Sequence, residues 1–132
     1  FRPNGTRFEF NGIDPQTATF THSGAPYSWF HHLRVRNPFT VTIVATSTTS
    51  VQVNGDLDLL NGTTVTTGES ITALGTASLS EGSTYNGTAV LDVGNTITIA
   101  DTSTMNASTL RARWYLNMDT TAILTGSRVE LY

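Results

Sequence analysis

Alternation of apolar and polar residues is the feature that most limits what this chain can fold into. It is clear in the segments Arg7-Phe8-Glu9-Phe10, Thr96-Ile97-Thr98-Ile99 and Leu110-Arg111-Ala112-Arg113. A period of two residues places apolar side chains on one face of an extended strand and polar side chains on the other. No stretch of ten residues shows the apolar spacing of a helix. The sequence therefore predicts an all-β protein with little or no helix.

Turn residues separate the alternating segments. Asn-Gly occurs five times and favours tight turns, at Asn4, Asn11, Asn54, Asn61 and Asn86. We interpret residues 51–59, centred on Asn54-Gly55, as a β-hairpin. About ten short strands at spacings of roughly 8 to 12 residues are typical of a sandwich or barrel. No internal repeat of about 20 to 50 residues is apparent. We therefore expect residues 1–132 to form a single domain, an antiparallel β-sandwich or jelly roll.

The expected core consists of apolar residues at alternate strand positions. These are Phe8, Phe10, Phe20, Leu33, Val35, Val41, Ile43, Val53, Leu57, Leu59, Leu91, Ile97, Ile99, Leu116, Ile123 and Val129. Trp114 shares a strand face with Leu110 and Leu116, so we expect it to be buried as well. Tyr115 lies on the opposite face and is a better candidate for contact with a ligand.

Composition narrows the setting of the protein. The chain has 25 threonines among 132 residues, no lysine, no cysteine and a formal net charge of -3. Threonine is β-branched and favours strands, and such chains are common among surface fibres, adhesins and virion proteins. We therefore expect an extracellular or virion-surface location. The chain begins at Phe1 without a signal sequence, which suggests a processed product or an excised domain.

Several function classes lack support in the sequence. The absence of cysteine excludes disulfides and thiol catalysis, and the acidic charge balance argues against nucleic-acid binding. No apolar segment approaches the roughly 18 residues of a membrane helix, so no membrane insertion is expected. The histidines and carboxylates form no recognisable catalytic motif. We expect no catalytic residues, no enzymatic activity and no cofactor.

Two pairs of residues carry groups that can bind metals, and only Asp56 and Asp58 remain as weak candidates. His31 and His32 are adjacent, so on a strand they would point to opposite faces and could not hold one ion. Asp56 and Asp58 share a face and offer oxygen ligands suited to calcium. The alternative, a solvated strand face, is favoured because their spacing does not match a calcium-binding loop.

The arginines supply the candidate ligand-binding site. Two arginine pairs alternate with other polar or aromatic residues, and the candidate set is His32, Arg34, Arg36, Arg111, Arg113 and Tyr115. If their strands were neighbours, the guanidinium groups could hold a carboxylate or phosphate of an anionic glycan. The favoured alternative is that these arginines pair with Asp and Glu across the sheet or across a subunit contact.

Four N-x-Ser/Thr sequons would carry glycans in a host that glycosylates secreted proteins. They begin at Asn4, Asn61, Asn86 and Asn106.

Two segments resemble the trimeric jelly roll of the tumour-necrosis-factor and C1q superfamily, including the C-terminal knobs of phage fibres and minor tail proteins. Residues 90–97 resemble the turn L-x-x-G-D-x-I, with Asn95 in place of aspartate. Residues 123–129 resemble the closing strand, with Leu124 in place of phenylalanine. Residues 24–27 are one residue longer than the G-x-Y near the start of that fold. The resemblance, mainly over residues 85–132, implies a trimer with its termini together and receptor-binding loops at the other end.

These observations lead to three functional hypotheses. The first is a non-enzymatic head or decoration domain of a virion or surface fibre that forms a homo-oligomer, with a trimer as our expectation, and attaches to a surface glycan or protein receptor. The second is a structural subunit of an extracellular filament, in which the N-terminal segment completes a neighbour's sheet. The third is a carbohydrate-binding module, which predicts a monomer that its glycan stabilises thermally.

Overall fold

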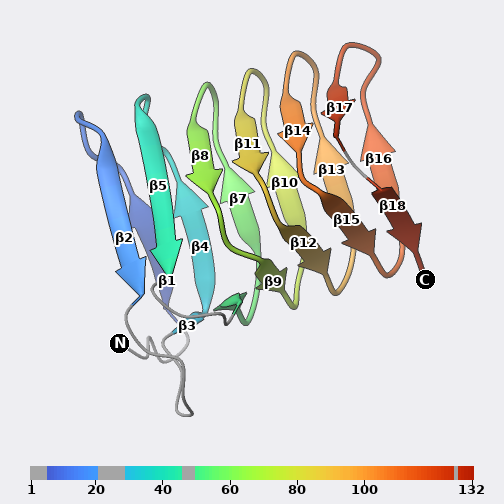
Figure 1. The fold of residues 1–132 in the computed structure, drawn as a ribbon. Helices are drawn as coiled ribbons and strands as arrows, with labels where there is room; N and C mark the ends of the chain where they lie inside the picture. Colours follow the sequence, from blue (N-terminus) through green and yellow to red (C-terminus); the bar gives the residue numbers. More distant parts are fainter. Residues whose placement is uncertain (1–5, 21–28, 46–49, 127) are drawn as a thin grey trace.

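The computed structural model describes residues 6–20, 29–45, 50–126 and 128–132. The described part consists of short strands joined by turns and contains no helix, which confirms the all-β prediction. It therefore also contains no helix that could cross a membrane. The strands wind into a stack of successive turns of chain, a β-solenoid, in which each turn contributes one strand to each of three sheets (Figure 1).

Every third strand belongs to the same sheet. Sheet A contains β1 (Arg7–Phe10), β4 (His32–Val35), β7 (Leu57–Leu59), β10 (Ala77–Leu79), β13 (Ile97–Ile99) and β16 (Leu116–Met118). Sheet B contains β2 (Gln16–Phe20), β5 (Thr40–Ala45), β8 (Thr64–Thr67), β11 (Thr84–Gly87), β14 (Thr104–Asn106) and β17 (Ile123–Thr125). Sheet C contains β3 (Trp29–Phe30), β6 (Val51–Val53), β9 (Ile71–Ala73), β12 (Val90–Val93), β15 (Thr109–Ala112) and β18 (Arg128–Leu131).

The pairing register reveals an internal repeat that the sequence analysis missed. In sheet A, Leu57 lies beside Ala77 and Ala77 beside Ile97. Residues at equivalent positions of these coils, such as Asp58 and Ser78, are separated by 20 in the sequence. The expectation that the chain contains no repeat of the solenoid type was therefore wrong. Each coil repeats the in-and-out alternation of its neighbours, so apolar side chains stack in rows inside the solenoid.

The strands of all three sheets are parallel, which contradicts the expected antiparallel sandwich or jelly roll. Residues 51–59 do not form the expected hairpin, because β6 belongs to sheet C and β7 to sheet A. Asn54-Gly55 is instead a corner of the coil. The backbone N–H of Asn54 donates to the carbonyl of Phe30, 2.8 Å away in the preceding coil.

The resemblance to a trimeric jelly-roll knob is overturned by the same topology. Residues 90–97 run from β12 in sheet C around a corner to β13 in sheet A, and residues 123–129 run from β17 to β18. The first and last described strands, β1 and β18, lie at opposite ends of the solenoid rather than together (Figure 1). Residues 24–27 lie outside the described part of the chain.

The core fills the interior of the solenoid and matches most of the expected residues. Leu33, Val35, Leu57, Leu59 and Ile97 are among the fully buried side chains. The same interior also holds buried residues that were not among the expected core residues: Val51, Val65, Ile71, Tyr85, Val93 and Met105. Leu110, which shares a strand face with Trp114 in the sequence, is buried as well.

Three residues expected in the core are exposed. Trp114 is 65% exposed at the corner that follows β15, so the prediction of burial was wrong. Ile123 pairs with Thr104 on the outer face of sheet B, and Val129 belongs to the last coil. Val129 pairs with the buried Leu110, but no described coil covers it on the other side, and it is 40% exposed. The side chain of Phe20 is outside what the structure describes.

Candidate functional site

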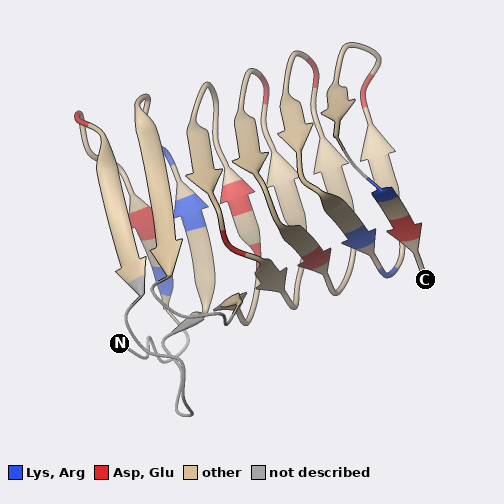
Figure 2. Ribbon diagram, viewed as in Figure 1, with Lys and Arg blue, Asp and Glu red and all other residues tan. Residues whose placement is uncertain are grey.

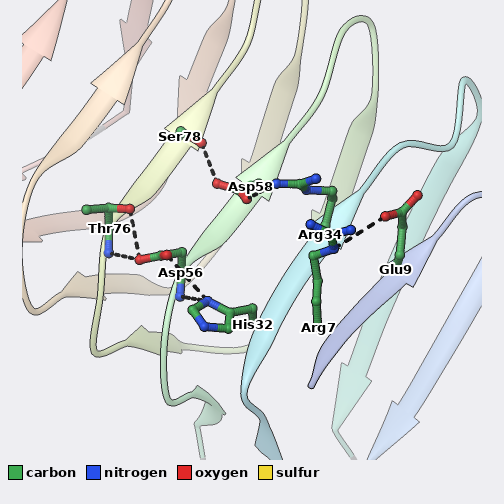
Figure 3. Close-up of polar contacts among 8 residues, drawn as sticks. All are labelled: Arg7, Glu9, His32, Arg34, Asp56, Asp58, Thr76 and Ser78. Atoms are coloured by element: carbon green, nitrogen blue, oxygen red, sulfur yellow. Dashed lines mark hydrogen bonds and ion pairs between the residues drawn. The ribbon is translucent and has the colours of Figure 1, made fainter. Parts of the chain in front are cut away.

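Charged and polar side chains form a row across the outer face of sheet A. Arg34 on β4 pairs with Asp58 on β7, with 3.1 Å between the Nη2 and Oδ2 atoms. The other oxygen of Asp58 accepts a hydrogen bond of 2.7 Å from the hydroxyl of Ser78 on β10 (Figure 3). Parallel in-register pairing brings these residues together, because Arg34, Asp58 and Ser78 occupy the same position in successive coils. The row joins three coils.

A second set of contacts lies at the corner that precedes β7. The backbone N–H of Asp56 donates to Nδ1 of His32 over 3.0 Å. Nδ1 of His32 also lies 3.3 Å from Oδ2 of the Asp56 carboxylate, where a protonated ring forms an ion pair with it. The carboxylate accepts hydrogen bonds from the backbone N–H and hydroxyl of Thr76 at 2.8 and 3.0 Å. Partial burial acts to raise the pKa of Asp56, but the hydrogen bonds from Thr76 and the proximity of His32 hold this pKa below its ordinary value.

The weak metal candidates, Asp56 and Asp58, make hydrogen bonds and ion pairs within the protein. Asp56 and Asp58 lie on the same side of sheet A, but their oxygens are hydrogen-bonded to Thr76, Ser78 and Arg34. His31 precedes β4, and its ring centre is 4.7 Å from that of His32, so the expectation that the two rings lie on opposite faces was wrong. Within the described residues, no group of three potential metal ligands is close enough to hold an ion.

A concave polar region lies on sheet C, near the C-terminal end of the solenoid. Asp92 on β12, Arg111 on β15, Arg113 at the following corner and Tyr132 after β18 line a hollow of about 410 Å³. We call it the sheet C hollow. It forms because Asp92, Arg111 and Glu130 occupy the same position on three successive strands, so their side chains project from the same face.

Glu130 organises one side of the sheet C hollow. Its Oε2 lies 2.7 Å from Nε of Arg111 and accepts a hydrogen bond of 2.8 Å from the hydroxyl of Tyr132. Its Oε1 lies 2.8 Å from Nε of Arg128. The hydrogen bond from Arg111, together with that from Tyr132, holds the pKa of Glu130 below its ordinary value. The hydrogen bond between Tyr132 and Glu130 raises the pKa of Tyr132, because loss of the phenolic proton would break this bond and place two negative groups together.

Arg113 differs from Arg111 in its contacts. Its side chain is exposed, and it has no ion pair or side-chain hydrogen bond with another described residue. Arg111 contributes a second guanidinium group, one edge of which is occupied by Glu130. A planar guanidinium group binds carboxylate, sulfate or phosphate through two parallel hydrogen bonds. The sheet C hollow thus offers an anion a free arginine beside the phenol ring of Tyr132.

The structure separates the six candidate ligand-binding residues. His32 and Arg34 lie on sheet A, and Arg36 is exposed just after β4. Arg111 and Arg113 line the sheet C hollow, whereas Tyr115 lies 62% exposed at the corner and is not among the lining residues. The two arginine pairs therefore do not form one patch. Arg34 and Arg111 form ion pairs across neighbouring strands, as the alternative interpretation proposed.

Asp92, Glu130 and Tyr132 were missed as site residues. The length of one coil is the signal that could have found them, because Glu130 follows Arg111 by close to one coil and lies directly beside it.

The sequons lie at a corner, on sheet B and outside the described residues. Asn61 is exposed at a corner, Asn86 and Asn106 lie side by side on sheet B, and Asn4 is outside the described residues.

Comparison of the chain with protein families, curated proteins and solved structures gave no match to any of them.

Proposed function

We propose that the chain is a non-enzymatic attachment domain of a virion or an extracellular fibre, which binds an anionic surface glycan through the sheet C hollow. The observation that carries this proposal is Arg113, an exposed guanidinium group without an ion-pair partner among the described residues, beside Arg111 in a concave surface. Most other described arginines already pair with carboxylates, among them Arg7, Arg34 and Arg128.

The chemistry of the lining supports a sugar acid or sulfated sugar over a simple inorganic anion. Arg113 would hold the acidic group in two parallel hydrogen bonds. The ring of Tyr132, 72% exposed, offers an apolar surface for the sugar ring. Asp92 lines the same hollow and supplies an acceptor for sugar hydroxyls. Asp92 and Arg111 lie on strands, and Arg113 and Tyr132 directly follow strands, so the sheet fixes the positions of these groups relative to one another.

Binding of acidic and neutral oligosaccharides to the whole chain, measured by calorimetry, tests the proposal. We expect Arg113→Ala to weaken binding of a sulfated or carboxylated oligosaccharide by about 10- to 100-fold, the value of a charged hydrogen bond. Arg36→Ala is the matched control, because Arg36 is also exposed but lies just after β4, at the end of a strand of sheet A. If neutral and acidic oligosaccharides bound equally well, the ligand would not be recognised by its acidic group. If Arg113→Ala and Arg36→Ala weakened binding equally, the sheet C hollow would not be the binding site.

The last coil favours a second candidate, the structural subunit of a filament. Its inward-facing Met118 and Leu131 are 40% and 58% exposed, and the outer edges of β16, β17 and β18 pair with no other described strand. Free parallel edges with apolar side chains favour pairing with another chain. A head-to-tail contact between copies gives an open filament when its rotation does not close into a ring.

Light scattering with multi-angle detection distinguishes these arrangements. A mass that grows with concentration, and that Leu131→Asp reduces to a monomer, would support the filament. A constant trimer mass would support the closed oligomer expected of an attachment domain, and a monomer would favour the carbohydrate-binding module.

A further inference from the structure

The outer face of sheet B carries a regular array of threonine and asparagine side chains, with the exposed Val44 and Ile123 at its margins. One row across the strands consists of Thr40, Thr64, Thr84 and Thr104. A second row, two positions further along each strand, consists of Thr17, Thr42, Thr66, Asn86, Asn106 and Thr125. We call the two rows together the threonine face. The parallel pairing keeps both rows in register from coil to coil.

The threonine face differs from the other two outer faces in charge. The six strands of sheet B carry no charged residue, whereas sheets A and C carry arginines and carboxylates (Figure 2). Among the described side chains of sheet B, none on the outer face is aromatic, since Tyr85 on β11 is buried in the core. Flat aromatic rings are the usual platforms for sugar rings, so a polysaccharide finds little to stack on here.

Five hydroxyl groups in the middle of the threonine face are available to an external partner. Those of Thr42, Thr64, Thr66, Thr84 and Thr104 form no side-chain hydrogen bond with another described residue. Asn106 donates to Asn86 over 3.0 Å, which fixes two amides side by side in the second row. Branching at Cβ also restricts the side-chain torsion of threonine, so its hydroxyl and methyl groups are held in place with little loss of entropy.

The spacing of the array sets the kind of partner. Neighbouring strands lie about 4.7–4.9 Å apart, and alternate residues on a strand lie about 6.6 Å apart. A complementary ligand must therefore repeat in two dimensions at about these intervals. The water molecules on a prism face of hexagonal ice form a rectangular array with comparable intervals. We propose that the threonine face binds ice, with hydroxyls that hydrogen-bond to surface water and methyl groups that fit between the water molecules. This proposal is independent of the proposed glycan binding.

Partition of the whole chain into slowly grown ice tests the proposal. We expect the ice fraction to be enriched several-fold over the remaining solution, and the protein to slow the coarsening of ice grains. Thr66→Tyr, at the centre of the threonine face, should reduce the enrichment to that of a protein that does not bind ice, because a ring there holds the flat array away from the crystal. Tyrosine favours strands, so the sheet is retained.

Thr72→Tyr is the matched control. Thr72 is the middle residue of β9 in the same coil, but its side chain lies on the outer face of sheet C. Both variants should keep the wild-type circular dichroism spectrum, and Thr72→Tyr should keep the ice enrichment. An unenriched wild-type protein, equal loss in both variants, or adsorption to crystalline polysaccharide without enrichment in ice would overturn the proposal.

Discussion

Tyr85 is the residue at which the core departs most from its own repeat. It occupies the position held by Val65 and Met105 in the neighbouring coils. Its side chain is fully buried, and its hydroxyl has no hydrogen-bond partner among the described residues. Gly87 makes room for it, since a Cβ atom at Gly87 would lie 2.7 Å from Cε1 of Tyr85. Burial raises the pKa of Tyr85 far above its ordinary value, so the hydroxyl stays neutral.

We predict that Tyr85→Phe stabilises the protein. A buried hydroxyl without a partner costs about 1–3 kcal/mol in lost hydration, and phenylalanine removes that cost while it keeps the ring. The free energy of unfolding in urea should rise by about 1 kcal/mol. A decrease would show that the hydroxyl is hydrogen-bonded to a trapped water molecule.

At the scale of the elements, side chains at the corners add hydrogen bonds between one coil and the next to those of the paired strands. Asp56, at the corner between β6 and β7, accepts two hydrogen bonds from Thr76 at the corresponding corner of the next coil. This arrangement is coupled to pH, because the pKa of Asp56 is lower in the folded protein than its ordinary value. A depressed pKa stabilises the fold above the unfolded-state value near 4, and this contribution disappears as the pH falls through the folded-state value.

We therefore predict that Asp56→Asn reduces the sensitivity of the fold to acid. At pH 6 the variant should be less stable than the wild type by on the order of 0.5 kcal/mol, since solvent screens a side chain that is 40% exposed. The difference should shrink as the pH is lowered below 4, as measured by chemical unfolding at several pH values. A difference that is constant with pH would contradict the assignment to the carboxylate.

The elements also show what sequence could and could not predict. The alternation places Val53 and Leu57 correctly on strands with buried side chains, and Asn54-Gly55 correctly at a turn. Alternation is the same, however, whether a strand pairs with the next strand or with one a coil away. The hairpin and the jelly roll were wrong for this reason, because the partner of each strand is a long-range property.

The repeat was hidden because its corners vary in residue type. Gly62, Gly82 and Thr102 occupy the same corner in successive coils and share positive φ angles of 71°, 72° and 59°. The third position carries threonine rather than glycine, which conceals the match. The site was also predictable only in part. The sequence correctly grouped Arg111 with Arg113, which line the same hollow. Glu130 lies beside Arg111 only because of the pairing register between coils, which the sequence did not predict.

At the scale of the molecule, each strand pairs only with strands of the coils directly before and after it. Stability in such an array is approximately a sum over coils and their interfaces. We predict that deletion of residues 77–96, one coil, leaves a folded solenoid in which β7 pairs with β13. Its circular dichroism should remain that of a β protein, with a lower thermal midpoint.

Deletion of residues 77–86 is the control for this prediction. It removes half a coil and brings strands of different sheets into the same position, so we expect an unfolded or aggregated product. If both deletions unfolded the protein equally, the coils would not be independent units.

The opposite placement of β1 and β18 has a mechanical consequence (Figure 1). The hydrogen bonds between strands run along the axis that joins these two ends, so tension applied there opens them in succession rather than all at once. A solenoid pulled in this way would yield coil by coil from an end. Unfolding of one 20-residue coil of the regular part would add about 66–72 Å to the extended length of the chain. A force–extension curve would then show force peaks at equal intervals.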